Sequence, residues 1–186
     1  MKKKVLFVFS ILFLFMLLTA DTDIPAGDVS GVWDAAGSPY NIEGTIQIIA
    51  GSQLVIEPGV VVNFTGYYKF NILGTILAQG DEDNFITFTT ADMETGWHGL
   101  RFFDTTTTGQ DQSLLQYCIF EYGHATGVSP DYQGGALYCI NSSELVIQYS
   151  TFHDNSAVTG GAVYLQNSHI ELNYVEITGN SASGAG

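Results

Sequence analysis

Positive charge is what this chain has least of. Its 186 residues include five Lys and Arg against 19 Asp and Glu, and three of these cations, Lys2, Lys3 and Lys4, stand together at the N-terminus. Beyond residue 20 only Lys69 and Arg101 remain, so two positive charges against 19 negative ones give a net charge of −17. Binding to nucleic acid or to anionic lipid depends on clustered Lys and Arg. We therefore expect no nucleic-acid partner.

A helical pattern is missing as well. Outside the first twenty residues no window places apolar residues at helical spacing, which excludes the helical repeat families. Residues 1–20 combine three lysines, an apolar run from Val5 to Leu18, and Thr19-Ala20 before Asp21, as is typical of a secretory signal peptide. The run is short for a membrane span. We predict cleavage and export to the medium or cell surface, with no stable membrane span afterwards; an uncleaved anchor is the alternative.

Two stretches near the C-terminus repeat each other. Gly134–Tyr138 (Gly-Gly-Ala-Leu-Tyr) returns as Gly160–Tyr164 (Gly-Gly-Ala-Val-Tyr), and Asn155–Ala157 returns as Asn180–Ala182. The offset is 26 residues at the start of the unit and 25 at its end. Self-similarity at such a period marks a solenoid, in which each repeat buries its apolar face against its neighbours.

The content of the repeat indicates which solenoid this is. Apolar and polar residues alternate in short runs such as Leu145–Tyr149 and Ile170–Tyr174, with Gly, Asn and Ser between the runs. This predicts an all-β chain, a right-handed parallel β-helix solenoid of about six or seven coils. We divide the chain into a signal peptide (1–20), an N-terminal lead-in and cap (21–43) and the β-helix proper (44–186).

Several motifs, in order, resemble a known group of proteins. Val55–Val60 (Val-Ile-Glu-Pro-Gly-Val), Gly96–Phe102 (Gly-Trp-His-Gly-Leu-Arg-Phe), Tyr117–Gly123 and the Gly-Gly-Ala units are similar to those of bacterial secreted right-handed β-helix proteins of the pectate-lyase-like superfold. The resemblance covers nearly all of the chain after residue 20 and implies the fold. Lyases, hydrolases, adhesins and inert surface fibres share this superfold, so the resemblance does not assign an activity.

Residues for catalysis are scarce. A calcium-dependent polysaccharide lyase needs metal-binding carboxylates and a cation to abstract a proton. Arg101 is the one strong candidate, because Lys69 lies far from it in sequence. Inverting glycosidases of this superfold pair carboxylates across a cleft, whereas Asp81–Asp83 and Asp92 with Glu94 lie in turn-like segments. We interpret these acidic runs as solvated loops and expect no cofactor, with weak calcium binding as the alternative.

The histidines show no metal-ligand spacing. His153 stands beside Asp154, but successive strand residues point to opposite faces, so we do not expect the two side chains to act as a pair. No metal site and no catalytic residue is therefore assigned.

Aromatic residues provide the candidate binding surface. Five of them fall at or beside predicted turns and insertions, where flat rings can stack on sugars: Tyr67, Tyr68, Trp97, Tyr122 and Tyr132. The alternative is that Trp97 and several of the tyrosines cover the ends of the core.

Two sets of residues recur in ways that suggest structural roles, whereas the two cysteines do not recur. Tyr117, Tyr149 and Tyr174 recur in register and predict a stacked ladder, and Asn141 with Asn167 predicts an asparagine ladder at a turn. The only two cysteines, Cys118 and Cys139, stand at different points of the repeat, which favours buried free thiols over a disulfide.

Together these observations predict a secreted or cell-surface scaffold or adhesin-like module without catalysis in this segment. Its expected partner is a polysaccharide or a cell-surface glycan. The alternative is an incomplete polysaccharide lyase or glycoside hydrolase. Because the chain stops at Gly186, where another Gly-Gly-Ala unit should begin, we expect further coils beyond it and self-association through the open C-terminal coil, with Val163, Leu165, Ile170, Leu172 and Ile177 in that last coil.

Overall fold

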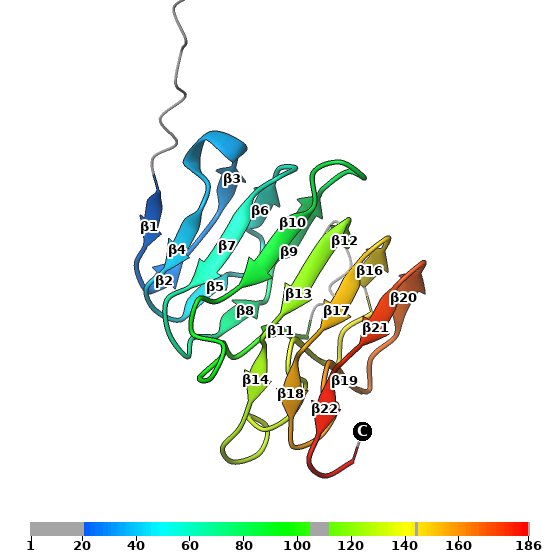
Figure 1. Ribbon diagram of the computed structural model, residues 1–186. Coiled ribbons are helices and arrows are strands. Elements are labelled where there is room, and N and C mark those ends of the chain that lie inside the picture. The colour runs from blue at the N-terminus through cyan, green and yellow to red at the C-terminus, as the bar shows by residue number, and fades with distance from the viewer. Residues whose placement is uncertain (1–20, 105–111, 144, 186) are drawn as a thin grey trace, which may run out of the picture.

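Strands of this protein enter three sheets in rotation, so that the chain winds as a coil (Figure 1). The computed structural model describes residues 21–104, 112–143 and 145–185. The predicted signal peptide (1–20) and residues 105–111, 144 and 186 lie outside the described residues.

Sheet A contains seven strands in the described chain: β1 (Thr22–Ile24), β4 (Tyr40–Ile42), β7 (Val61–Phe64), β10 (Ile86–Thr89), β13 (Cys118–Glu121), β17 (Thr151–His153) and β21 (Glu176–Thr178). Sheet B contains six: β2 (Gly27–Asp28), β5 (Ile46–Ile48), β8 (Phe70–Ile72), β11 (Leu100–Phe103), β15 (Leu137–Ile140) and β19 (Val163–Gln166). Sheet C also contains six: β3 (Gly31–Trp33), β6 (Gln53–Ile56), β9 (Thr75–Gln79), β12 (Ser113–Gln116), β16 (Leu145–Gln148) and β20 (Ile170–Asn173). A short sheet D adds β14 (His124–Ala125), β18 (Ser156–Ala157) and β22 (Ser181–Ala182).

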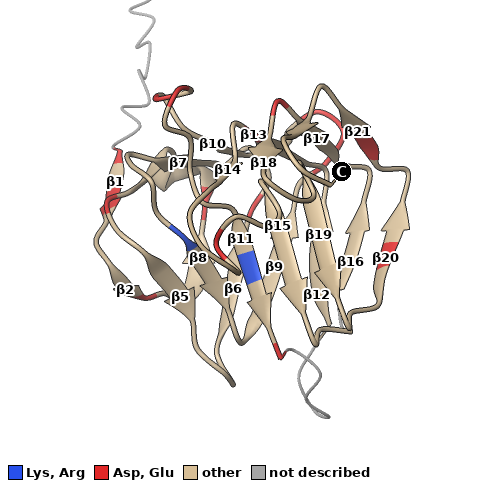
Figure 2. Ribbon diagram, turned by 90° about the horizontal axis from the view of Figure 1, so that it is seen from below, with Lys and Arg blue, Asp and Glu red and all other residues tan. Residues whose placement is uncertain are grey.

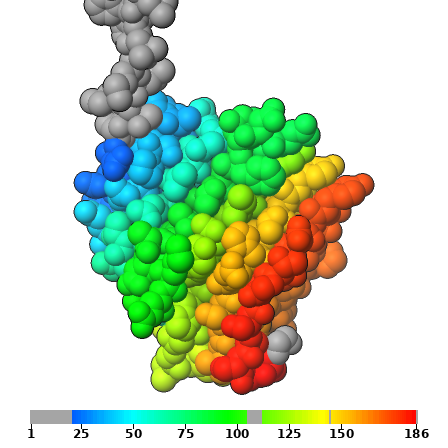
Figure 3. Space-filling model, in the orientation of Figure 1, coloured from blue at the N-terminus to red at the C-terminus, as the bar shows by residue number. Residues whose placement is uncertain are grey.

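The pairing confirms the predicted parallel β-helix. Each strand pairs in parallel with the strand one coil later, and the Gly-Gly-Ala repeats align as expected, with Leu137 opposite Val163 and Tyr138 opposite Tyr164. Successive coils follow one another as oblique bands from blue to red in Figure 3. The number of strands in sheets A to C corresponds to six to seven coils.

Residues 21–43 begin all three large sheets, through β1 to β4. They also contain the single helical turn of the described chain, the 3-10 helix η1 (Ala35–Gly37). The Asp34 carboxylate accepts hydrogen bonds from the backbone of Ala36 and Gly37 and so caps this turn. The proposed division of the chain at residue 43 stays a prediction.

The core lies inside the coil because alternate strand residues point inward. Strand β6 shows the pattern, with Leu54 and Ile56 buried and Gln53 and Val55 partly exposed. Aromatic rings stack in the core from coil to coil. The Phe88 and Phe120 ring centroids are 4.9 Å apart, and those of Phe120 and Phe152 are 4.5 Å apart. Each coil therefore supplies one layer of a continuous apolar core.

Both predicted side-chain ladders are present. The rings of Tyr117, Tyr149 and Tyr174 stack with centroids 5.0 Å apart at each step. All three residues have a positive φ, because a single left-handed residue turns the chain from sheet C to sheet A. Asn167 Nδ2 donates to Asn141 Oδ1 at 3.4 Å. Repeating contacts of this kind align the corners of successive coils.

The two thiols are free and buried, as predicted. Cys118 and Cys139 both point into the core, and burial raises the pKa of each above its ordinary value. They behave as small apolar side chains.

The last coil comprises β19 to β22 and forms the red edge of Figure 3. Leu165, Leu172 and Ile177 are 42%, 45% and 49% exposed there, in contrast to the buried residues at the same places one coil earlier. Residues after β22 continue the stack, since Ser183 N donates to Ala157 O at 3.0 Å. The five apolar residues expected in this coil all belong to it.

Candidate functional site

The two cations beyond residue 20 lie on the outer face of sheet B. Arg101 is on β11, which pairs with β8, and Arg101 stands opposite Asn71 of that strand. Lys69 directly precedes β8. Figure 2 shows one blue segment leading into β8 and the other on the neighbouring strand β11. Because Leu100 and Phe102 point into the core, Arg101 points outward between them.

A segment that we call the covering loop, residues 126–133, lies over this face. It follows β14 and is tied down by side chains from two earlier coils. Thr126 N donates to the Tyr67 hydroxyl at 2.9 Å, and Lys69 Nζ donates to Asp131 Oδ1 at 2.7 Å. His98 Nε2 lies 2.8 Å from Asp131 O. A carbonyl oxygen only accepts, so the His98 Nε2 carries the proton.

Burial of Arg101 is nearly complete, with 2% of the residue exposed. Its Nε donates to His98 O at 2.8 Å, and its Nη1 donates to Gln133 O. Its guanidinium carbon lies 5.2 Å from the centre of the Tyr138 ring, a cation–π contact. The buried Nη2 has no hydrogen-bond acceptor among the residues that the structure describes. One strong donor of a buried cation is thus unsatisfied.

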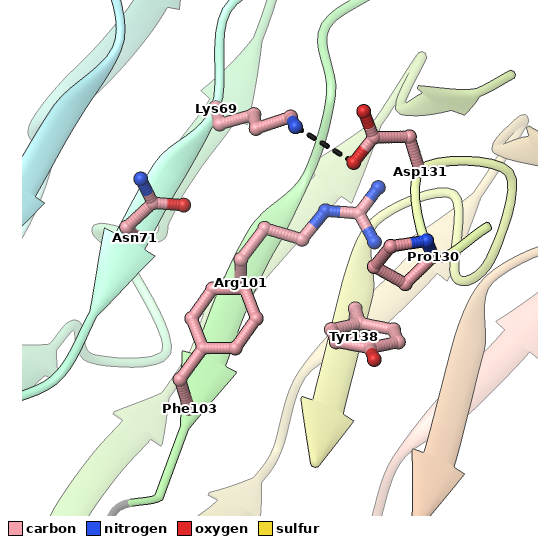
Figure 4. Close-up of a pocket in the computed structure, with 7 residues that line it drawn as sticks. All are labelled: Lys69, Asn71, Arg101, Phe103, Pro130, Asp131 and Tyr138. Atoms are coloured by element: carbon pink, nitrogen blue, oxygen red, sulfur yellow. Dashed lines mark hydrogen bonds and ion pairs between the residues drawn. The ribbon is translucent and has the colours of Figure 1, made fainter. Parts of the chain in front are cut away.

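Beside this guanidinium is a pocket of about 220 Å³ (Figure 4). Strands β8, β11 and β15 form its floor and the covering loop forms its wall. Figure 4 shows the guanidinium between Asp131 on one side and Pro130 and Tyr138 on the other. The lining residues are Lys69, Asn71, Arg101, Phe103, Pro130, Asp131 and Tyr138.

The electrostatics of the pocket are positive, unlike the rest of the chain. Burial lowers the pKa of Arg101 to about 10, which leaves it charged at neutral pH. Burial and the charges of Arg101 and Lys69 lower the pKa of His98 to about 4, so this histidine is neutral. Partial burial alone would raise the pKa of Asp131, but the hydrogen bond and charge of Lys69 outweigh it and lower the pKa. Two cations therefore face one carboxylate.

The five predicted aromatic residues do not form one surface. Tyr67 belongs to the covered face, where its ring centroid lies 4.6 Å from that of His98. Tyr132 lies in the covering loop, and Tyr68 packs partly against the core. Tyr122 directly follows β13 of sheet A, and its ring centroid lies 6.5 Å from that of His153. These four tyrosines are each partly exposed.

Trp97 is a core residue. It is fully buried, its ring stacks on Phe64 with centroids 4.3 Å apart, and its Nε1 donates to Glu121 O at 2.8 Å. The indole therefore has no face open to a ligand, and the interpretation of Trp97 as a sugar-stacking residue is corrected to a role in the core. The structure places it there because it occupies a position in the internal aromatic stack.

The acidic segments lie in turns. Asp81 Oδ1 accepts from the backbone of Asp83 and Asn84, and Asp92 Oδ1 accepts from Thr95 N. Hydrogen bonds from Thr95 lower the pKa of Asp92. Within residues 21–104, 112–143 and 145–185, no three His, Cys, Asp or Glu side chains converge as a metal site would require.

One expectation about the histidines was wrong. His153 Nδ1 lies 3.0 Å from Asp154 Oδ2, although the sequence predicts that their side chains diverge. The reason is that β17 ends at His153 and Asp154 has a φ of 55°, which turns its carboxylate back toward the ring. Glu121, one coil earlier, lies 3.4 Å from His153 Nε2. This cluster is partly exposed on the outer face of sheet A.

Comparisons with known proteins give one match. The chain is similar to a protein described as "Probable outer membrane protein PmpA" of Chlamydia muridarum (strain MoPn / Nigg), with 32% identity over 99 residues. The match covers 53% of this chain and 8% of that protein. No protein-family profile matches the sequence, and no solved structure matches it. The similarity thus links about half of this chain to a small part of a much longer protein.

Sequence reasoning missed the pocket for a simple reason. Lys69 and Arg101 lie 32 residues apart, and their separation in sequence counted against a shared site. One coil contains roughly that number of residues here, so positions so separated become neighbours on adjacent strands, as Asn71 and Arg101 are. The signal that could have found the pocket is the scarcity of cations itself. His98, Asp131 and Tyr138 carried no comparable signal.

Proposed function

We propose that this chain is a non-catalytic β-helix scaffold within a secreted or cell-surface protein, adhesin-like in character. The observation that carries the proposal is that outward-facing side chains bond along the helix axis to the equivalent residue of the next coil. Gln148 Nε2 donates to Gln116 Oε1 at 3.0 Å, and Asn63 Nδ2 donates to Asn41 Oδ1 at 2.9 Å. Polar side chains that bond to one another along the axis stabilise the stack of coils, which is a structural role and not a catalytic one.

The comparison with known proteins supports a surface role. The similar chlamydial protein is described as a probable outer membrane protein. Within the described residues no helix is long and apolar enough to cross a bilayer. The strong negative charge favours solubility and repels other anionic surfaces.

Carbohydrate contact through tyrosines is the finer part of this proposal. Tyr67, Tyr68, Tyr122 and Tyr132 are each partly exposed beside a turn or loop. A flat ring of this kind provides a large apolar face together with a polar hydroxyl. A glycan on a polysaccharide or cell surface is the partner that we propose for these rings.

Location is tested on intact cells that express the full chain. We expect externally added protease to degrade the protein without cell lysis. The matched control is the double variant Leu12→Arg/Leu14→Arg, which interrupts the apolar run of the predicted signal peptide and should keep the protein protected. Protection of both proteins would contradict a surface or secreted location.

Binding is tested with a glycan array and purified protein. Tyr67→Ala and Tyr132→Ala should reduce glycan binding, whereas Tyr174→Ala should not, because Tyr174 is exposed but belongs to the axial ladder. The enzyme alternative is tested with pectin, polygalacturonate and alginate, with and without calcium. Turnover of any of these polymers that disappears in Arg101→Gln would contradict the scaffold proposal and favour a lyase.

A further inference from the structure

The unsatisfied donor of Arg101 is the strongest unexplained feature of the molecule. The residue is 98% buried and carries a charge, and its Nε and Nη1 have protein acceptors, whereas Nη2 has none among the described residues. Buried charged donors nearly always have an acceptor, because an unmade hydrogen bond leaves the cost of desolvation unopposed. An acceptor from outside the chain would remove this cost.

Charge around the pocket selects an anion. Lys69 and Arg101 contribute two positive charges, and Asp131 contributes one negative charge, which leaves a local charge of +1. His98 adds none, since its pKa of about 4 keeps it neutral. Lys69 and Arg101 are the only Lys and Arg beyond residue 20, where the net charge of the chain is −17. A monoanion neutralises the pocket, whereas a dianion would leave a negative charge in an already negative protein.

The shape of the pocket narrows the class of anion further. Its volume of about 220 Å³ admits a small molecule or the end group of a larger one. The free Nη2 of the guanidinium can donate a charge-assisted hydrogen bond to a carboxylate oxygen. The Asn71 amide and the Tyr138 hydroxyl also line the pocket and offer hydrogen bonds to neighbouring hydroxyl groups.

We propose that this pocket binds a small monoanionic carboxylate, held by Arg101 Nη2 and by the charge of Lys69. This ligand goes beyond the proposed glycan contacts of the tyrosines and does not depend on them. Nη2 is covered by protein in this structure. Binding therefore requires the covering loop to shift, and the ligand should alter hydrogen exchange in residues 126–133.

The test uses the fact that Arg101 is the only arginine of the chain. In a ¹⁵N-labelled protein the arginine Nε–Hε region therefore contains one signal. The probes are sodium acetate, sodium glucuronate, glucose and sodium phosphate, added at constant low ionic strength. Glucose differs from glucuronate in lacking the carboxylate. We expect saturable shifts of the arginine signal with a carboxylate, at a dissociation constant of about 1 mM or tighter, and none with glucose.

Two variants that each add one negative charge test whether binding takes place in this pocket. Asn71→Asp builds a carboxylate into the pocket and should weaken binding by at least about tenfold. Gln53→Glu adds the same charge on sheet C, outside the pocket, and should change binding by less than about twofold. Both positions are partly exposed on strand faces, so both variants should fold.

Each outcome decides the proposal. Equal binding of acetate and glucuronate supports recognition of a free small acid, and binding of glucuronate alone supports a carboxylate carried by a sugar. No shift with either carboxylate overturns the proposal. So does a shift with glucose, tighter binding of phosphate than of either carboxylate, or binding that survives in Asn71→Asp.

Discussion

The Lys69 ammonium lies 2.7 Å from a carboxylate oxygen of Asp131, although 62 residues separate the two in the chain. This ion pair connects the start of β8 to the covering loop. It is partly exposed, and exposed ion pairs contribute little to global stability. Its importance is local, because it holds the loop over the buried Arg101.

Removing this ion pair should loosen the covering loop and leave the β-helix folded. In a double-mutant cycle of Lys69→Met and Asp131→Asn, we expect a coupling free energy of about 0.5–1 kcal/mol. Hydrogen exchange should accelerate in residues 126–133 and stay unchanged in β6 and β9. Lys69→Arg, which keeps the charge, is the control. Faster exchange throughout the coil would contradict a local role.

Acid should destabilise the protein partly through His98. Its pKa is about 4 when folded and 6.5 when unfolded, so the unfolded chain binds the proton more readily. The stabilisation from neutral His98 is therefore present above pH 6.5 and is lost as the pH falls toward 4, by up to ~3 kcal/mol. The free energy of unfolding of His98→Gln should fall less steeply over this range. An equal pH dependence of the free energy of unfolding in the two proteins would contradict this role of His98.

The stability cost of a substitution in the tyrosine ladder should depend on how well the new residue tolerates a positive φ. Tyr149 has a φ of 51°, and its ring stacks on both Tyr117 and Tyr174. Tyr149→Val should destabilise by about 2–3 kcal/mol, because a β-branched residue is strained there and the stacking is lost. Tyr149→Asn should cost less, since asparagine tolerates this region. Chemical denaturation distinguishes the two, and equal losses would mean that the backbone conformation contributes nothing.

Self-association through the last coil is the fourth prediction. Leu165, Leu172 and Ile177 form an exposed apolar edge, and strand edges can pair with another chain. We propose that the purified protein associates through β19 to β21, and that the double variant Leu172→Lys/Ile177→Lys is monomeric by light scattering. Val128→Lys is the control, because Val128 is exposed in the covering loop. A wild-type protein that is monomeric at high concentration would disprove this association.

The sequence alone determined the architecture and its repeating details. The parallel β-helix, the stacked Tyr149 and Tyr174, and the Asn141–Asn167 contact all follow from one pattern repeated at a fixed spacing. In a solenoid each repeat contacts its neighbours in the same way, so a periodic sequence specifies periodic contacts. The buried free thiols follow from the same logic, since their places within the repeat do not coincide.

Only the tertiary structure decided what happens where the repeat is interrupted. The covering loop brings Asp131 to Lys69 and closes over Arg101, and no period predicts where an insertion folds. Trp97 stands beside a turn in sequence yet stacks inside the coil on Phe64. Asp154 meets His153 because one left-handed residue reverses its direction. The candidate site depends on such nonperiodic contacts, whose partners are fixed by packing in three dimensions rather than by spacing along the chain.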